Sequence, residues 1–323
     1  MPPKAQPSRS NEQKAAIEAF RKDARLMTGA DPSLIVQRIS TGLAVLDDIL
    51  NGGIPRRRMT ILTGVYSSGK SFLIQLIMRR AIDEGLSVVY VDTEQTFDPE
   101  WWTQVGLPLS KIHVSQPTCG EDAAEVMVGA AKAGVDIIAL DSLAALYPKK
   151  MVEEEDFEKN FMGHRARLIN RMIETLISVK PTGAIVCTNQ VRDNFSSMPG
   201  VPDMPGGRGM KHYTSLILRL QREGWIEEKG KRVGFNIRVV CAKSKVGTPF
   251  GECILPFRFR GDIDMMSLLL DRALEHGLVE QRGPWYYIRV AGEEIRLQGR
   301  NSVLDLLGER KDLVEALEGA MRA

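Results

Sequence analysis

The sequence predicts an α/β fold in which a mostly parallel central sheet is flanked by helices, with one small module before it and another after it. Between residues 59 and 190, short apolar runs such as "MTILTG", "SVVYVD" and "DIIALD" alternate with helical stretches, which is typical of a parallel sheet covered on both faces. Two later runs, "YTSLILRLQ" and "GFNIRVVCAKS", resemble antiparallel strands joined by a charged hairpin, and the sheet is expected to end there. After residue 263 the pattern changes to a small α+β module.

The expected elements follow in order along three segments, 1–37, 38–262 and 263–323. The first segment predicts a helix over 11–27 and a short strand in "PSLIVQRIS" at 32–40. The second opens with "STGLAVLDDILNGGIP", which indicates a turn, a helix and a Gly-Gly stop. Its further helices are expected over 70–84, 99–105, 121–133 and 158–179. The last has an apolar stripe of Phe161, Leu168, Ile169, Met172, Ile173, Leu176 and Ile177.

Composition excludes several classes of protein. The chain has 323 residues, 43% hydrophobic and 26% charged, and no apolar run approaches the roughly 18 residues that a membrane span needs. The N-terminus lacks the apolar segment of a secretory signal, so an intracellular, cytoplasmic protein is expected. Four cysteines without a C-x-x-C pair, and no H-E-x-x-H, argue against a disulfide framework or a zinc site. The net charge of +2 does not indicate whether the protein binds nucleic acid, because binding depends on where the charges lie rather than on their sum.

A phosphate-binding loop is the most specific motif. "GVYSSGKS", Gly64–Ser71, matches G-x-x-x-x-G-K-[ST] between a predicted strand and a predicted helix. In that setting loop N–H groups and the helix N-terminus face phosphates, Lys70 reaches the β and γ phosphates, and the Ser71 hydroxyl binds magnesium. The expected nucleotide-binding residues in and beside the loop are Tyr66, Ser67, Ser68, Gly69, Lys70, Ser71 and Phe72.

Three polar residues stand at the ends of other predicted strands. Asp141 ends "DIIALD", as a magnesium-shell carboxylate does, although it could instead cap the next helix. Glu94 follows "VVYVD" and could deprotonate a water that attacks the γ phosphate, or it could be a solvated surface acid. Gln190 ends "AIVCTNQ", where its amide could contact the γ phosphate and transmit its presence to the next segment.

That next segment, "VRDNFSSMPGVPDMPGGRGM" at 191–210, has neither helical nor strand periodicity. Irregular stretches of this length inside a domain are either functional or disordered. Because Gln190 stands directly before this segment, bound nucleotide could control its order.

The separate landmarks occur together in one family. The series "ISTG...LD...G", "SSGKS", "VDTE", "SQP..GE", "DSLAAL.PK", "MG..AR", "NQVR", "GG...K.Y" and "K.K...PF" resembles the bacterial RecA recombinase family from about residue 12 to 290. The resemblance implies a RecA-type P-loop ATPase core that uses ATP and Mg²⁺ and forms a helical filament on single-stranded DNA. It also implies pairing with homologous double-stranded DNA and strand exchange, with single-strand-binding protein and loading factors as further partners.

The resemblance assigns roles in hydrolysis. It implies that Glu94 is the general base, that Ser71 and Asp141 serve the metal, partly through water, and that Gln190 takes part in catalysis. Lys243 and Lys245, in "VVCAKSKVGTPF", would reach the γ phosphate of a neighbouring subunit, whereas an isolated K-x-K would usually be solvated charge.

Two more groups of residues gain roles from the resemblance. Asp98 and Trp101, in "FDPEWW", would hold the adenine, although Trp101 could instead anchor a helix to the core, as we prefer for Trp102. The segment 1–37 would dock on the adjacent subunit, its strand extending the neighbour's sheet.

The resemblance also implies a DNA site in two loops, 155–163 and 191–210, and in the helix that follows the first loop. We expect the second loop to order when nucleotide and DNA are both bound. Basic and glycine residues suit contacts to phosphates, and apolar residues can enter between bases. The expected DNA-binding residues are Met162, Gly163, Arg165, Arg167, Arg171, Arg192, Phe195, Met198, Gly206, Gly207 and Arg208. For Met162, ordinary packing is the alternative.

Three positions depart from the family pattern: Tyr66, Gln95 and His212 stand where Glu, His and Phe are usual. They indicate a divergent or phage-encoded member, in the latter case acting in the host cytoplasm. Two other functions fit a RecA-type core, namely a mediator paralogue without strand exchange and a ring-shaped helicase. The complete set of candidate catalytic residues argues against the first, and the flanking modules argue against the second.

Overall fold

The computed structural model describes residues 11–23, 27–153, 163–191 and 206–322. The chain divides into two units, residues 1–37 and 38–323, which are described separately. In the first unit, helix α1 spans Asn11–Asp23 and a 3₁₀ turn spans Pro32–Leu34. The expected strand over 32–40 is wrong for its first part: the Asp31 carboxylate accepts a hydrogen bond from Ser33 N at 2.9 Å and starts the 3₁₀ turn. Only Arg38–Ile39 form a strand, β1.

A nine-stranded sheet forms the centre of the second unit, in the order β11-β10-β9-β8-β3-β7-β6-β4-β5, and β1 and β2 form a separate two-stranded sheet. Strands β3 to β8 run parallel, and β9 to β11 are antiparallel. The predicted α/β fold with a mostly parallel sheet is therefore confirmed. The strands are β2 (Ile54–Pro55), β3 (Met59–Gly64), β4 (Val88–Asp92), β5 (Ile112–Ser115), β6 (Ile137–Asp141), β7 (Ala184–Gln190), β8 (Leu216–Glu228), β9 (Lys231–Ser244), β10 (Glu252–Arg258) and β11 (Asp262–Ile263).

The sheet extends beyond the point where the sequence predicted its end. Strands β10 and β11 add to the antiparallel edge, and the charged stretch between β8 and β9 is itself strand as far as a turn at Lys229 and Gly230. Beyond Leu220 the residues of β8 are mostly exposed, so the two strands leave the core as a ribbon. The charged composition of residues 222–232 predicts a connection, but the backbone there continues as solvent-exposed strand up to the turn.

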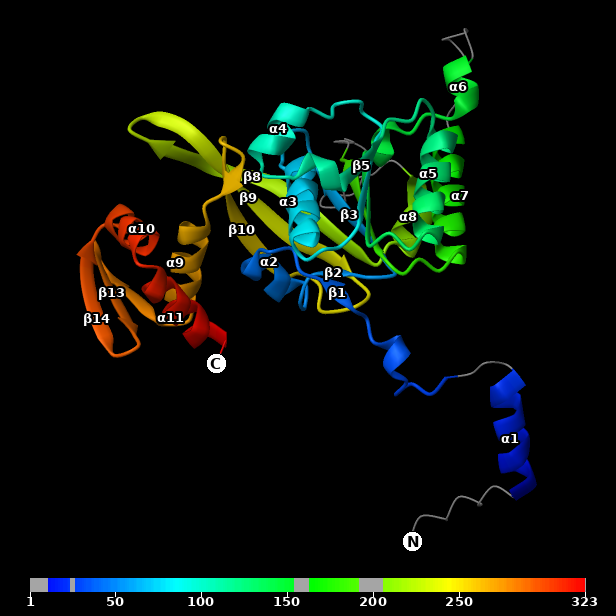
Figure 1. Cartoon of the computed structure of the whole chain (residues 1–323), viewed down its shortest axis with the longest axis horizontal. Helices are drawn as coiled ribbons and strands as arrows, with labels where there is room; N and C mark the ends of the chain where they lie inside the picture. The colour runs from blue at the N-terminus through cyan, green and yellow to red at the C-terminus, as the bar shows by residue number, and fades with distance from the viewer. Residues whose placement is uncertain (1–10, 24–26, 154–162, 192–205, 323) are drawn as a thin grey trace. The chain divides into compact units, whose positions relative to one another are not determined.

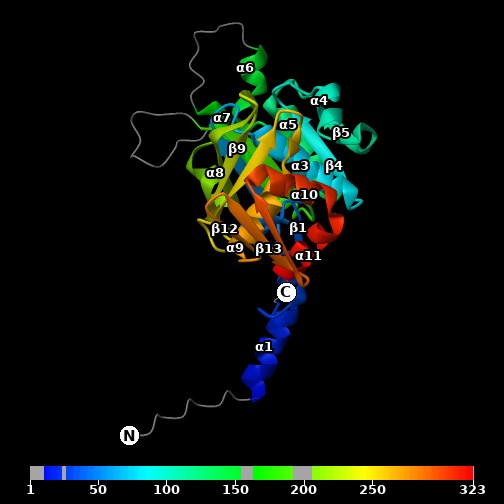
Figure 2. The ribbon, with the colours of Figure 1, turned by 90° about the vertical axis from the view of Figure 1, so that its left-hand side faces the viewer.

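Helices cover both faces of the sheet, as Figures 1 and 2 show. One apolar core joins the sheet to α2, α3 and α4, and a second joins the other face to α5, α7 and α8. Strand β3 serves both cores, because Leu62 belongs to the first and Ile61 to the second, as the alternation of a strand requires. The helices are α2 (Ala44–Ile49), α3 (Lys70–Asp83), α4 (Pro99–Gln104), α5 (Gly120–Lys132), α6 (Lys149–Glu153), α7 (His164–Ser178) and α8 (Gly207–Tyr213), with 3₁₀ turns at Leu109–Lys111 and Leu143–Ala145.

The expected helix over 158–179 is described from His164, and its first residues, Phe161 among them, lie outside the described ranges. Its apolar stripe is present: the core includes Ile169, Met172, Ile173 and Leu176. Ile177, expected on the same stripe, is 45% exposed, and it contributes to a surface cavity described below.

The last part of the chain has a core of its own. It contains α9 (Met265–Glu275), the antiparallel strands β12 (Val279–Arg282), β13 (Trp285–Val290) and β14 (Glu293–Gln298), and the helices α10 (Arg300–Glu309) and α11 (Lys311–Arg322). One face of this small sheet packs against the helices in a third apolar cluster. The expected small α+β module is therefore present. None of the described helices is long and apolar enough to cross a membrane.

Asp264 ties α9 to the central sheet. Its carboxylate caps α9 by accepting from Ser267 N at 3.0 Å, and it forms an ion pair with Arg258 of β10. Burial alone would raise the pKa of Asp264, but the Arg258 guanidinium and the Ser267 N–H outweigh it and lower this pKa below its ordinary 3.8. A carboxylate of this kind stabilises the fold above its unfolded pKa, and that contribution is lost as the pH falls through the folded pKa.

We expect Asp264→Ala to lower the free energy of unfolding at neutral pH by about 1–2 kcal/mol, because a helix cap and an ion pair are both removed. Denaturant unfolding measures the difference, and Asp264→Asn, which can keep the cap, should lose less. The difference between Asp264→Ala and the unmodified chain should shrink in acid, below pH 3.8. A difference that is independent of pH would contradict the assignment.

Candidate active site and nucleic-acid surface

The phosphate loop connects the end of β3 to the start of α3. Gly69 is the N-cap of α3 with φ of 90°, a conformation that glycine adopts easily. A Cβ at Gly64 would collide with the backbone oxygen of Leu220, and one at Gly69 with the Ile237 side chain. The Ser68 hydroxyl is buried in the loop and has no hydrogen-bond partner among the described residues. The glycines and this hydroxyl fit a loop that closes around phosphate.

Lys70 lies over the loop. Its side chain is buried, and Nζ donates to the backbone oxygens of Gly64 at 3.1 Å and Val65 at 2.8 Å. Burial lowers the pKa of Lys70, while the nearby carboxylates of Asp141 and Glu94 act in the opposite direction. The Lys70 amine is therefore held beside the loop, close enough to Asp141 and Glu94 to interact with their charges.

Asp141 is a buried carboxylate at the end of β6. One oxygen accepts from the Thr188 hydroxyl and the other from Tyr90 OH at 3.2 Å. The alternative role as a helix cap is not observed, because Ser142 is the N-cap of the next turn and that cap has no side-chain hydrogen bond. Burial and the Asp141 charge raise the pKa of Tyr90, so this hydroxyl stays a donor. Tyr90 and Thr188 were not predicted from the sequence, where their only signal is a polar group within an apolar strand.

Glu94 follows β4, and its carboxylate contacts residues at the ends of two other strands, β6 and β7. Its Oε1 accepts from the Ser142 hydroxyl at 2.6 Å and from Gln190 Nε2 at 3.5 Å. Thr93 fixes the same turn, because its N–H donates to Asp141 O and its hydroxyl to Ser142 O, both at 2.9 Å. Ser142 was not predicted from the sequence. The structure thus brings Glu94, Gln190, Asp141 and Lys70 to one edge of the sheet.

Asp98 and Trp101 lie at the start of α4. Asp98 caps this helix by accepting from Glu100 N at 3.0 Å. The Trp101 indole donates to Gln75 Oε1 at 3.2 Å and packs partly buried against the core, so it does anchor α4 to α3. Trp102 is 2% exposed and packs against Tyr90, as expected of an anchor. An adenine contact by Asp98 and Trp101 stays a prediction.

Lys243 and Lys245 contact the end of α8. The ammonium of Lys243 donates to Lys211 O and that of Lys245 to His212 O, at the carbonyl end of the helix, where positive charge is stabilised. Burial lowers the pKa of Lys243, and the neighbouring Lys245 lowers it further. The two lysines therefore have defined partners and are not simply solvated charges. Through α8 they connect to the segment that begins at residue 192.

The candidate DNA residues are only partly described. Gly163 caps α7 with φ of 91°, Gly206 and Gly207 begin α8 with φ of 110° and 68°, and the Arg165 guanidinium lies 4.3 Å from the centre of the Tyr147 ring. A Cβ at Gly206 would lie 2.7 Å from Met210 Sδ, so packing also favours glycine there. Arg167 and Arg171 line a groove between α5 and α7. Met162, Arg192, Phe195, Met198 and the side chain of Arg208 lie outside what the structure describes.

The described residues include no group of three or more His, Cys, Asp or Glu side chains arranged to hold a metal ion. Magnesium in nucleotide sites usually binds one or two protein groups together with phosphates and water, so Ser71 and Asp141 fit that chemistry without such a cage. The four cysteines, Cys119, Cys187, Cys241 and Cys253, are free thiols.

Comparison with known proteins identifies the family. Residues 11–263 match the family model described as the RecA N-terminal domain. The chain is 35% identical to Protein RecA of Thermus aquaticus, over 96% of this chain and 92% of that protein. It is 33% identical to Protein RecA of Chlorobaculum tepidum, with 99% and 94% covered, and 32% identical to that of Aquifex pyrophilus, with 94% and 87% covered. The chain therefore belongs to the bacterial RecA family, whose members are ATP-hydrolysing DNA recombinases of homologous recombination and repair.

Proposed function

We propose that this recombinase binds ATP with Mg²⁺ at the edge of the sheet formed by the ends of β3, β4, β6 and β7. The supporting observation is the convergence of Lys70, Asp141, Glu94 and Gln190 at that edge, next to a loop in which two glycines admit no Cβ. When bound, ATP supplies the γ-phosphoryl group and Mg²⁺ offsets its charge. Lys70 and the loop N–H groups hold the phosphates, and Ser71 and Asp141 serve the metal, partly through water.

Glu94 is the general base in this proposal. The two hydrogen bonds that it accepts from described residues, Ser142 and Gln190, end on Oε1, and Oε2 is the oxygen proposed to accept a proton from water. Gln190 connects this carboxylate to the segment after β7, so a nucleotide that attracts the amide would alter that contact. Asp98 and Trp101 are proposed to hold the adenine, and Tyr66 and Ser67 to complete the nucleotide surface. The Phe72 side chain is buried against Phe257, so Phe72 could contribute to that surface only through its backbone.

In this proposal a neighbouring subunit supplies two further catalytic groups. Lys243 and Lys245 are proposed to act on the nucleotide of a neighbouring subunit, exchanging their present partners on α8 for phosphate. Residues 1–37, as a polymerisation module, would dock on that neighbour, and the core and small domain would be 38–262 and 263–323. The proposed assembly is a helical filament on single-stranded DNA, with the loop residues and basic helix of the predicted DNA site facing the backbone. Single-strand-binding protein and loading factors are proposed as further partners.

Ser142 is proposed as the residue that orients Glu94. We expect Ser142→Ala to lower kcat about tenfold, which corresponds to about 1.4 kcal/mol, while KM for ATP changes little. The reason is that the carboxylate loses its 2.6 Å donor and rotates away from the water. DNA-stimulated phosphate release measures both constants.

Ser142→Thr is the matched control, because it retains the hydroxyl and should recover most of the rate. Unchanged kcat in Ser142→Ala would remove Ser142 from this role. If kcat falls equally in Ser142→Ala and Ser142→Thr, the loss is caused by altered packing at this position. That result would also refute the role of the Ser142 hydroxyl.

A further inference from the structure

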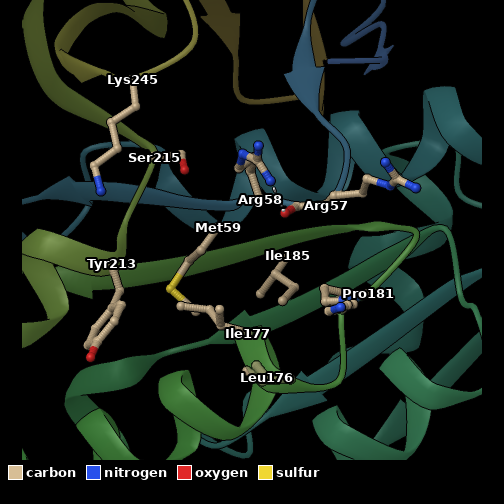
Figure 3. Close-up of a pocket in the computed structure, with 11 residues that line it drawn as sticks. Arg57, Arg58, Met59, Leu176, Ile177, Pro181, Ile185, Tyr213, Ser215 and Lys245 are labelled. Carbon is tan, nitrogen blue, oxygen red and sulfur yellow. Dashed lines mark hydrogen bonds between the residues drawn. The ribbon is translucent and has the colours of Figure 1, made fainter. Parts of the chain in front are cut away.

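A cavity of about 590 Å³ lies at the end of the sheet opposite the phosphate loop. It opens beside the first residues of β3 and β7, between the C-terminal ends of α7 and α8 (Figure 3). Its floor is buried and mostly apolar, formed by Met59, Leu176, Pro181 and Ile185. Its volume is in the range of cavities that hold a ligand or an anchoring side chain.

The rim of the cavity is basic. Four exposed cations surround the floor: Arg57, Arg58, Lys180 and Lys245. In Figure 3, Arg57 and Arg58 lie on one side of the apolar floor and Lys245 on another. None of the described lining residues is a carboxylate; Glu174, which accepts a hydrogen bond from Tyr213 OH at 3.3 Å, stands beside the rim. Lys245 donates to a backbone carbonyl, and it forms no ion pair with any described carboxylate.

Apolar groups reach the solvent within this basic rim. Ile177 is 45% exposed and Tyr213 is 40% exposed. DNA phosphates would satisfy the cations but gain nothing from the apolar floor. An acidic peptide that also carries an apolar side chain would satisfy both, because burial of that side chain adds to the charge attraction.

The chain itself contains a segment of that composition. Residues 153–158, "EEEDFE", hold five acids in six positions around Phe157, and no other six-residue window of the sequence has five. This acidic segment lies within the stretch whose next residues are proposed to contact DNA. Its negative charge is repelled by phosphates, so the proposed function gives it no partner.

The acidic segment cannot reach the cavity of its own chain. Phe157 is four residues after Glu153, the end of α6, and therefore at most about 14 Å from it. Tyr147, just before α6, contacts Arg165 in the first turn of α7. The cavity begins at Leu176, which is twelve residues along α7 from His164, or about 18 Å. Since α6 points away from α7 in Figure 1, the occupant must come from a second copy.

We propose that, in the absence of DNA, residues 153–158 of one copy dock in the basic cavity of a second copy, with Phe157 on the apolar floor. Docking places acids beside Lys245. If Lys245 acts in trans on nucleotide, as proposed above, the docked state is also inactive in hydrolysis. DNA that engages the neighbouring loop residues releases the contact, so the docked and DNA-bound states exclude each other.

Sedimentation velocity of the full-length protein without DNA or nucleotide tests the docking. The variant Arg58→Glu/Lys180→Glu reverses two rim charges and spares Lys245, so its dissociation constant for self-association should rise about tenfold or more at low salt. Lys229→Glu/Lys311→Glu carries the same change of charge at exposed positions that do not line the cavity, and it should associate like the unmodified chain.

A second experiment reverses charges on the acidic segment instead of the rim. Glu153→Lys/Glu154→Lys should also lose association, and mixing it with Arg58→Glu/Lys180→Glu should restore association between the two proteins. A Phe157→Cys copy and an Ile177→Cys copy should be joined by a short bis-maleimide, and single-stranded DNA should suppress the product. The rim variant should keep its DNA-stimulated ATPase activity, so failure of the docking is distinguishable from failure of the proposed hydrolysis.

Unchanged self-association in the rim variant, or absence of restoration on mixing, would overturn the proposal. A rim variant that associates normally but binds single-stranded DNA more weakly would also overturn it, and would show that the cavity is a nucleic-acid site.

Discussion

Glu94→Gln is expected to lower DNA-stimulated kcat by about 10²–10⁴, the usual contribution of a general base, while the Kd for ATP stays within about threefold. Glutamine keeps an oxygen that accepts from Ser142 and Gln190, but it replaces the second carboxylate oxygen with an amide nitrogen that cannot take a proton. Steady-state phosphate release and binding of a fluorescent ATP analogue measure the two effects separately.

Glu275→Gln, an exposed carboxylate at the end of α9, is the control and should hydrolyse ATP normally. If Glu94→Gln hydrolyses ATP normally, Glu94 is a surface acid, the alternative that the sequence left open. If it fails to bind ATP, the residue holds the nucleotide, and the role of base is equally refuted.

Mixing two inactive variants should restore activity if Lys243 and Lys245 act across the subunit interface. The Lys243→Ala/Lys245→Ala variant should lose about 10²-fold or more in kcat, because positive charge that stabilises the transferring phosphoryl group is removed. Glu94→Gln fails in its own subunit. In a random 1:1 mixture on DNA, about a quarter of head-to-tail interfaces combine an intact Glu94 with intact lysines, so about a quarter of the normal rate should return.

The matched control mixes Glu94→Gln with Lys70→Ala. Both are expected to disable the subunit that holds the nucleotide, so that mixture should stay inactive. If the lysine and glutamate variants also stay inactive together while both still assemble on DNA, the lysines act within their own subunit through the α8 carbonyls that they contact in this structure.

Periodicity and local motifs predicted most of the architecture. Alternation of apolar runs with helices gave the parallel sheet, and the phosphate loop was found at the β3–α3 junction because its spacing and its flanking elements are local. The sequence was less informative where charge and exposure obscured the pattern. The two antiparallel strands are predicted, but the charged stretch 222–232 between them is mostly strand rather than connection, and Pro32–Leu34 form a 3₁₀ turn rather than a strand.

The site shows the same division. Lys70 could be singled out by the phosphate-loop motif, and Glu94, Asp141 and Gln190 because each ends or follows an apolar run. Ser142 and Thr188 could not, because a serine after an aspartate or a threonine in a strand has no distinctive local pattern. Their importance arises from strand order: β6 lies between β4 and β7, so Ser142 meets Glu94 and Thr188 meets Asp141.

The sequence by itself determined the class of fold, the phosphate loop and the polar residues at the strand ends, because each depends on neighbours within a few positions. Only the tertiary structure decided which oxygen of Glu94 is engaged, which carbonyls hold Lys243 and Lys245, and that four cations surround one apolar cavity. Such contacts join residues separated by dozens of positions or more, and their geometry follows from sheet order and helix packing rather than from local periodicity.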